Sequence, residues 1–132
     1  MAIKKDYDDI PGTYVFDADM SRKGYHLNMF CISLRLESGR TGFKADESAY
    51  LDTYPMTLEQ KQSVLNRDWN EMLRLGGNIY YTSKLAACDG INFQQLAALM
   101  TGSSEEDYRA MMLAGGRSIE GNRYKTDSEG DK

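Results

Sequence analysis

The stretch of residues 76–102 constrains the fold of this 132-residue chain most strongly. Two apolar segments with helical spacing meet there at residues 88–90, Cys-Asp-Gly, where glycine readily takes a positive φ and aspartate bonds its own backbone. The second segment has apolar residues at i, i+3, i+4 and i+7, which are Phe93, Leu96, Ala97 and Met100. The pattern predicts a helical hairpin with an aromatic residue near its bend.

The N-terminal half shows the same helical periodicity. Ser21 can cap a first helix whose apolar stripe is Leu27, Phe30, Cys31 and Leu34. Gly39 is typical of a residue just past a helix end, so we expect this helix to end near residues 38–39. A shorter helical segment spans residues 43–51, and Pro55 follows it.

Two capping boxes mark further helix starts. Thr57 with Gln60 opens the clearest helix, which is expected to carry its apolar side from Leu58 to Leu73 and to end at residues 76–77. Ser103 with Glu106 opens the last helix, which two glycines stop at residues 115–116.

These patterns predict an all-α fold in one compact domain of five or six short helices. No convincing alternation of apolar and polar residues predicts a strand, and no internal repeat is visible. We expect an irregular N-terminal arm over residues 1–20 and a helical domain over residues 21–124. The polar residues 125–132 predict a disordered tail, because they offer too little apolar area to order themselves.

Composition excludes several functional classes. The net charge is −4, from 20 acidic and 16 basic residues, and without a dense Lys/Arg run the chain is not expected to bind nucleic acid. No apolar run approaches the ~20 residues that a membrane span needs, and the N-terminus has no apolar signal core, so we expect a cytoplasmic protein. Cys31 and Cys88 are expected to be buried free thiols.

The sequence offers no self-contained active site. A metal site needs several converging His, Cys or carboxylate ligands, and His26 is the chain's only histidine. Neither cysteine lies in an evidently electropositive setting, and no GxSxG, GxxxxGK[ST] or GxGxxG motif occurs. The acidic pairs suit solvated helix faces and first turns better than catalysis. We therefore predict no catalytic residue and no metal ligand in this chain.

Several short motifs in register nevertheless carry a family signature. They are RKGYHLN (22–28), FKADESAYLD (43–52), GGNIYY with SKL (76–85), DG with FQ (89–94), MTG (100–102) and GGRS (115–118). In this order the chain resembles the small, or alpha, subunit of protocatechuate 4,5-dioxygenase, from about Asp9 to Tyr124.

The resemblance implies a role without chemistry of its own. In that family a larger beta subunit binds non-haem Fe(II) through two His and one Glu, and the extradiol enzyme opens a catechol carboxylate with O2. The all-helical alpha subunit covers the mouth of that site. The resemblance thus implies Fe(II) on the partner and not on this chain, and an α2β2 hetero-oligomer. A lid of this kind excludes water and selects ring substituents.

By resemblance, Phe93 lies close to the substrate pocket, whereas its helical spacing alone favours a core position. Asp89, Gly90, Tyr25 and Asn78 are the other candidate lid residues, although each could also cap, turn or pack locally. Ile91 departs from the family pattern just before Phe93, which leaves protocatechuate, gallate, a methylated catechol carboxylate and an aminophenol open as substrates. The competing hypothesis is a helical adaptor that binds proteins without iron chemistry.

Overall fold

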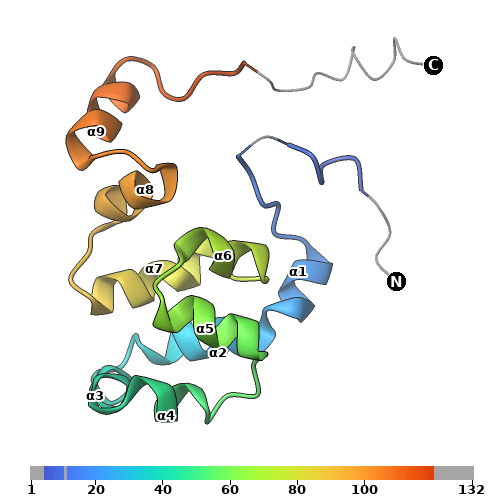
Figure 1. Cartoon of the computed structure of the whole chain (residues 1–132), viewed down its shortest axis with the longest axis vertical. Helices are drawn as coiled ribbons and strands as arrows, with labels where there is room; N and C mark the ends of the chain where they lie inside the picture. Colours follow the sequence, from blue (N-terminus) through green and yellow to red (C-terminus); the bar gives the residue numbers. More distant parts are fainter. Residues whose placement is uncertain (1–4, 11, 121–132) are drawn as a thin grey trace.

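The computed structural model describes residues 5–10 and 12–120, and within these ranges the chain forms nine short α-helices and no strand. The all-α prediction is confirmed for this part of the chain. The helices are α1 (Ala18–Lys23), α2 (Tyr25–Ser33), α3 (Glu37–Ala45), α4 (Glu47–Leu51), α5 (Leu58–Leu65), α6 (Trp69–Arg74), α7 (Ile79–Cys88), α8 (Phe93–Thr101) and α9 (Glu105–Leu113). Figure 1 shows α3 and α4 at one end of the molecule and α8 and α9 at the other.

One apolar core holds α2 to α7 together and takes in part of α8. The predicted stripe of α2 lies in it, with Leu27, Phe30 and Cys31 fully buried. The ring centroids of Phe30 and Phe43 lie 5.0 Å apart, which joins α2 to α3. Contributions from α4 to α8 complete the core, and they are Leu51, Val64, Trp69, Met72, Leu85, Ala86, Cys88 and Leu96. Cys31 and Cys88 are buried free thiols, as predicted.

The predicted end of the first helix is wrong. The chain leaves the helix after Ser33, and Gly39 lies inside α3 instead of beyond a helix end. The reason is packing: a Cβ on Gly39 would lie 2.0 Å from the Ser33 carbonyl oxygen. Gly39 therefore serves a close approach of α3 to the end of α2, and the segment predicted as 43–51 is two helices that meet at Asp46.

The predicted helix from Thr57 to residue 76 is also divided. Its capping box forms as expected, with Thr57 Oγ1 accepting from the Gln60 amide and the Gln60 side chain accepting from the Thr57 amide. The helix stops at Leu65 and restarts at Trp69, because Arg67 takes a left-handed φ of 51°. Leu58, predicted to face the core, is exposed. A third division separates α1 from α2 at Gly24, inside the helix predicted from Ser21, and together these divisions explain why nine helices form among the described residues instead of five or six.

The hairpin of residues 76–102 forms as predicted, with α7 and α8 joined by a turn in which Gly90 has a φ of 84°. Asn92 caps α8 and forms a capping box with Gln95. The cap of α9 lies one residue later than predicted: Ser104 accepts from the Asp107 amide, while the Ser103 hydroxyl lies 2.8 Å from that of Thr101. None of the residues of α9 is buried.

Buried amide side chains tie the start of the domain to its middle. Gln60 Nε2 donates to the carbonyl oxygens of Lys23 and Leu75, at 2.9 and 3.0 Å. Asn28 Nδ2 donates to the Gly76 carbonyl oxygen at 3.0 Å, and Asn28 Oδ1 accepts from the amide of Asn78. These bonds satisfy backbone groups that helix ends would otherwise leave unpaired.

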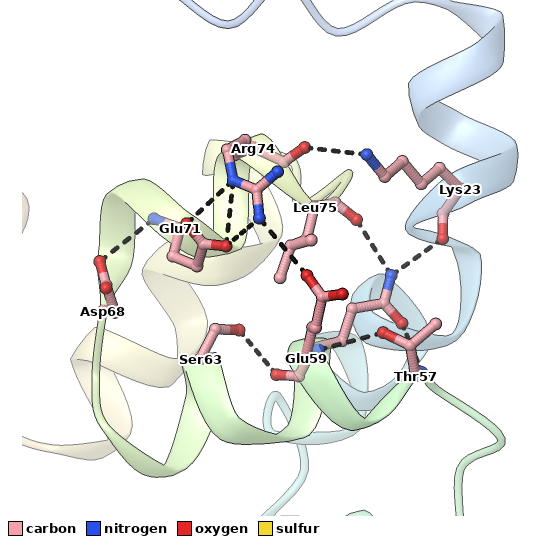
Figure 2. A network of polar contacts seen from close by, with 9 residues as sticks. Lys23, Thr57, Glu59, Ser63, Asp68, Glu71, Arg74 and Leu75 are labelled. Carbon is pink, nitrogen blue, oxygen red and sulfur yellow. Dashed lines mark hydrogen bonds and ion pairs between the residues drawn. The ribbon is translucent and has the colours of Figure 1, made fainter. Parts of the chain in front are cut away.

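A surface ion-pair cluster lies beside the Gln60 contacts. Figure 2 shows the Arg74 guanidinium between the carboxylates of Glu71 and Glu59. The described helices include none that is long and apolar enough to cross a membrane. The predicted arm, residues 1–20, and the domain range 21–124 stay predictions, and α1 starts at Ala18. The predicted tail, residues 125–132, lies outside the described residues.

Candidate functional site

An open hollow of about 670 Å³ lies where the N-terminal arm passes over α6, α7 and α8. Its floor includes one fully buried side chain, Leu96. The lining combines apolar side chains with a few hydroxyl, amide and carboxylate groups: Asp8, Asp9, Ile10, Gly12, Thr13, Tyr14, Asn70, Leu73, Ile79, Phe93, Leu96, Ala97, Met100, Thr101 and Tyr108. Such walls suit the contact of an aromatic or aliphatic group.

Phe93 lies at the rim of this hollow with 62% of its surface exposed. It is the first residue of α8, and the Asn92–Gln95 capping box fixes the backbone that carries it. The core position that helical spacing favoured is therefore wrong for Phe93 in this chain. Leu96, one turn later, occupies the core instead. Of the predicted stripe, Leu96 lies in the core and Met100 packs against it partly buried, whereas Phe93 stays outside.

The arm is attached beside the hollow by a compact charged cluster. The Lys5 ammonium contacts the carboxylates of Asp17 and Asp19, and the Tyr7 hydroxyl donates to Asp17 at 2.6 Å. The hydrogen bond from Lys5, followed by those from Tyr7 and the Met20 amide, lowers the pKa of Asp17 well below its usual range. Asp17 also caps α1, so one carboxylate joins the arm to the first helix.

Two of the candidate lid residues, Asp89 and Gly90, form the turn between α7 and α8. Asp89 accepts from Arg67 through both carboxylate oxygens, with Nε–Oδ2 and Nη2–Oδ1 distances of 2.6 and 3.1 Å. Gly90 supplies the positive φ, and a Cβ there would meet nothing within 4 Å. Neither residue lines the hollow.

The other two candidates, Tyr25 and Asn78, begin helices elsewhere. Asn78 caps α7 by accepting from the Tyr80 amide at 2.8 Å. Tyr25 is the first residue of α2, is exposed, and lies edge-on to the ring of His26 at 5.1 Å. Of the five candidate lid residues, Phe93 is the one that lines the hollow.

The sequence analysis did not predict that the N-terminal arm lines the hollow. It also did not predict the ion pair between Arg67 and Asp89, which lies at the turn between α7 and α8. Tyr14 of the arm and Tyr108 of α9 line the hollow. Neither belongs to an apolar sequence pattern that predicts a position at the hollow. Arg67 lies in an Asn-Arg-Asp segment between two apolar runs, a polar interruption that could have indicated the break after α5. No local pattern indicates that Arg67 bonds a residue 22 positions away.

The described residues do not form a metal site. No group of three or more His, Cys, Asp or Glu side chains within residues 5–10 and 12–120 could hold a metal ion. His26 is half-buried against Tyr25, and burial raises the pKa of the Cys31 thiol to about 12. Iron therefore does not fit the donor groups of this part of the chain.

The fold and the site thus define a small all-helical protein that displays an aromatic side chain at an open hollow. The chain matches the family model described as "Aromatic-ring-opening dioxygenase LigAB, LigA subunit" over residues 27–113, from α2 to the end of α9. That match covers most of the chain, and this protein belongs to the LigA subunit family. The family resemblance found in the sequence motifs is confirmed.

A curated relative gives a second comparison. The gallate dioxygenase of Pseudomonas putida is 28% identical over 101 residues, which are 76% of this chain and 30% of that protein. The chain therefore spans less than a third of the length of the relative it matches. Membership of the family links the chain to aromatic ring-opening dioxygenases.

Proposed function

We propose that this chain is the alpha subunit of an extradiol dioxygenase of the protocatechuate 4,5-dioxygenase type. In this proposal a larger beta subunit carries the non-haem Fe(II) and supplies the ring-opening chemistry. The alpha subunit covers the mouth of that site, and the two subunits form an α2β2 assembly. The substrate is a catechol carboxylate, with O2 as the second reactant.

The observation that carries the proposal is the exposure of Phe93 at the hollow. An isolated chain gains nothing from holding a phenyl ring in water, because burying such a side chain contributes about 1.5–3 kcal/mol. The capping box nevertheless fixes the helix start in a position that presents the ring outward. A ring presented in this way can pack on a partner and exclude water from a neighbouring pocket.

The length of the curated relative supports a larger partner. In the gallate dioxygenase the region like this chain is 30% of the protein, so most of that protein lies outside the match. In this proposal the beta subunit corresponds to that remainder. The relative's name makes gallate the first compound to compare with protocatechuate, and methylated catechol carboxylates and aminophenols complete the panel.

Iron is assigned to the partner because the described residues of this chain offer no converging ligand set. The purified chain is accordingly expected to hold no tightly bound iron after dialysis. Metal analysis tests this directly, and one equivalent of Fe(II) retained per chain would contradict the assignment.

The decisive experiment is a titration of this chain into the iron-loaded larger subunit, followed by absorbance of the ring-opened product across the panel. We expect the rate to rise to a plateau at an equimolar ratio. A larger subunit that is fully active alone and forms no complex with this chain would reject the lid and favour a helical adaptor.

The Phe93→Ala variant tests the lid more closely. We expect a changed KM or substrate preference in the assembled enzyme, with unchanged iron content, because removing the ring loosens the fit around the substrate. Tyr80→Ala removes an equally exposed aromatic from α7, away from the hollow, and serves as the matched control. Equal effects of the two substitutions would contradict a specific role for Phe93.

A further inference from the structure

Arg67 uses every hydrogen-bond donor of its guanidinium group. Nε and Nη2 donate to Asp89, Nη1 and Nη2 donate to the two carboxylate oxygens of Glu47 at 3.0 and 2.8 Å, and Nη1 also donates to the Val64 carbonyl oxygen at 2.7 Å. These are the five N–H donors of an arginine. The guanidinium carbon also lies 5.4 Å from the centroid of the Phe43 ring.

The backbone of Arg67 is held in an unfavourable conformation. Its φ of 51° makes it the one non-glycine residue with a positive φ among the described residues. Residues other than Gly, Asn and Asp rarely adopt this left-handed backbone region, and they stay in it only where their surroundings fix them. Here the strained residue is the elbow between α5 and α6, and its side chain reaches the first residue of α4, Glu47, and the turn before α8.

Arg67 and Asn70, in the first turn of α6, bond the chain on both sides of α8. Arg67 holds Asp89 in the turn that precedes α8, and Asn70 Nδ2 donates to the Met100 carbonyl oxygen in the last turn of α8 at 2.9 Å. Between them, Leu96 is the fully buried anchor of the helix. An open hollow of about 510 Å³, lined by Arg67, Asn70 and Met100 among others, leaves side-chain packing incomplete between the elbow and α8.

A continuous bonded path leads from Arg67 to Phe93. The Gly90 and Ile91 amides donate to the carbonyl oxygens of Ala87 and Ala86, at 3.0 and 2.9 Å, which fixes the turn after Asp89. Asn92 then caps α8, and Phe93 follows as the first helical residue. Only Gly90, Ile91 and Asn92 separate Asp89 from Phe93, and each of the three is held by these bonds.

We propose that Arg67 and Asn70 are positioning residues, Arg67 for the turn that precedes α8 and Asn70 for the last turn of α8, and that together they set the position of the Phe93 ring at the hollow. This inference rests on the proposed function of Phe93 as a lid residue. Lysine cannot replace Arg67, because its ammonium is a single point charge that cannot serve two carboxylates in bidentate geometry. Arg67→Lys and Asp89→Asn should therefore both release the turn, and Asn70→Ala should release the far end of α8.

The test labels the full-length chain with 4-fluorophenylalanine, which gives four ¹⁹F resonances because the chain has four phenylalanines. Phe93→Leu assigns the relevant signal. We expect Arg67→Lys and Asp89→Asn to shift or broaden the Phe93 resonance, since a loosened helix end exchanges on the microsecond to millisecond scale. Asp89→Asn keeps the Arg67 guanidinium beside the Phe43 ring. A change in the Phe93 resonance of this variant is therefore not caused by a disturbance of the core around Phe43. Arg74→Gln removes an ion pair of the same chemistry on α6 and should leave the Phe93 signal unchanged.

A second readout uses the assembled enzyme with protocatechuate and gallate. Arg67→Lys and Asp89→Asn are expected to raise KM by about three- to tenfold while kcat changes by less than about twofold, because a displaced lid weakens substrate binding without altering the reacting groups. An unchanged Phe93 resonance in both variants overturns the positioning role, whatever the kinetics. A shifted resonance with unchanged KM supports the hold on α8 and overturns the lid function of Phe93.

Discussion

The α2–α7 region and the α8–α9 pair are built from equally short helices, but they bury very different shares of their apolar residues. In the first region Leu27, Phe30 and Leu85 are fully buried. In the second, α8 buries Leu96 and Ala98, and α9 buries nothing. Leu113, the last residue of α9, is 82% exposed. Figure 1 shows this pair at the end of the molecule opposite α3 and α4.

The comparison shows that a short helix such as α9 can form although none of its residues is buried. Isolated helices shorter than ~12–15 residues are marginal in water, and α9 has 9 residues. Ser104 caps its start, and Glu105, Glu106 and Asp107 place negative charge in its first turn, where it interacts favourably with the helix dipole. Local chemistry therefore supports the helix, and Met112 and Leu113 at its end stay exposed.

The largest expected difference between the regions is the cost of removing a phenylalanine ring. Phe30→Ala should reduce the free energy of unfolding by ~3–5 kcal/mol, because the ring is fully buried against Phe43. Phe93→Ala should change it by less than ~1 kcal/mol, because most of that ring is already in water. Thermal and urea unfolding of the full-length chain measure both values. Similar losses for the two variants would show that Phe93 is part of the core.

A smaller difference is expected between two capping boxes of the same design. Thr57→Ala should reduce global stability by ~1 kcal/mol, because it unpairs the Gln60 amide next to the buried Gln60 side chain. Asn92→Ala removes the equivalent bond to Gln95, but the lost stability should appear as local opening of α8 and α9. Amide hydrogen exchange compared with thermal unfolding separates the two cases. An equal drop in Tm without faster exchange in α8 would mean that α8 unfolds only with the core.

Local chemistry and periodicity predicted much of the fold. The stripe of α2, the capping box at Thr57 and the turn at Gly90 all lie where the sequence indicated. The errors have a common cause, since both residues respond to contacts that bring different helices together: Gly39 lies against Ser33 at the end of α2, and Arg67 bonds Glu47 and Asp89. A glycine at a close approach looks the same in sequence as a glycine at a helix end, and only tertiary packing separates them.

The candidate site was less accessible to sequence reasoning. Phe93 was singled out by family resemblance, while its spacing pointed to the core. Asp89 was placed among the lid residues, but its partner Arg67 could not be predicted. An ion pair between residues far apart in the sequence produces no periodic pattern. Tyr14 and Tyr108 meet at the hollow only after the arm and α9 have folded beside α8.

The smallest expected effect concerns the exposed end of α9. Met112→Ser with Leu113→Ser should change the free energy of unfolding by no more than ~0.5 kcal/mol per substitution, because both side chains are exposed. The same variant should reduce self-association of the isolated chain and weaken its binding to the larger subunit, since exposed apolar groups on an otherwise supported helix favour a protein contact. Sedimentation velocity measures the first effect and a binding titration the second. Leu58→Ser, at an equally open position on α5, is the matched control and should leave both unchanged. If Leu58→Ser weakened association as much as the α9 variant, general surface hydrophobicity rather than the α8–α9 pair would account for the contact.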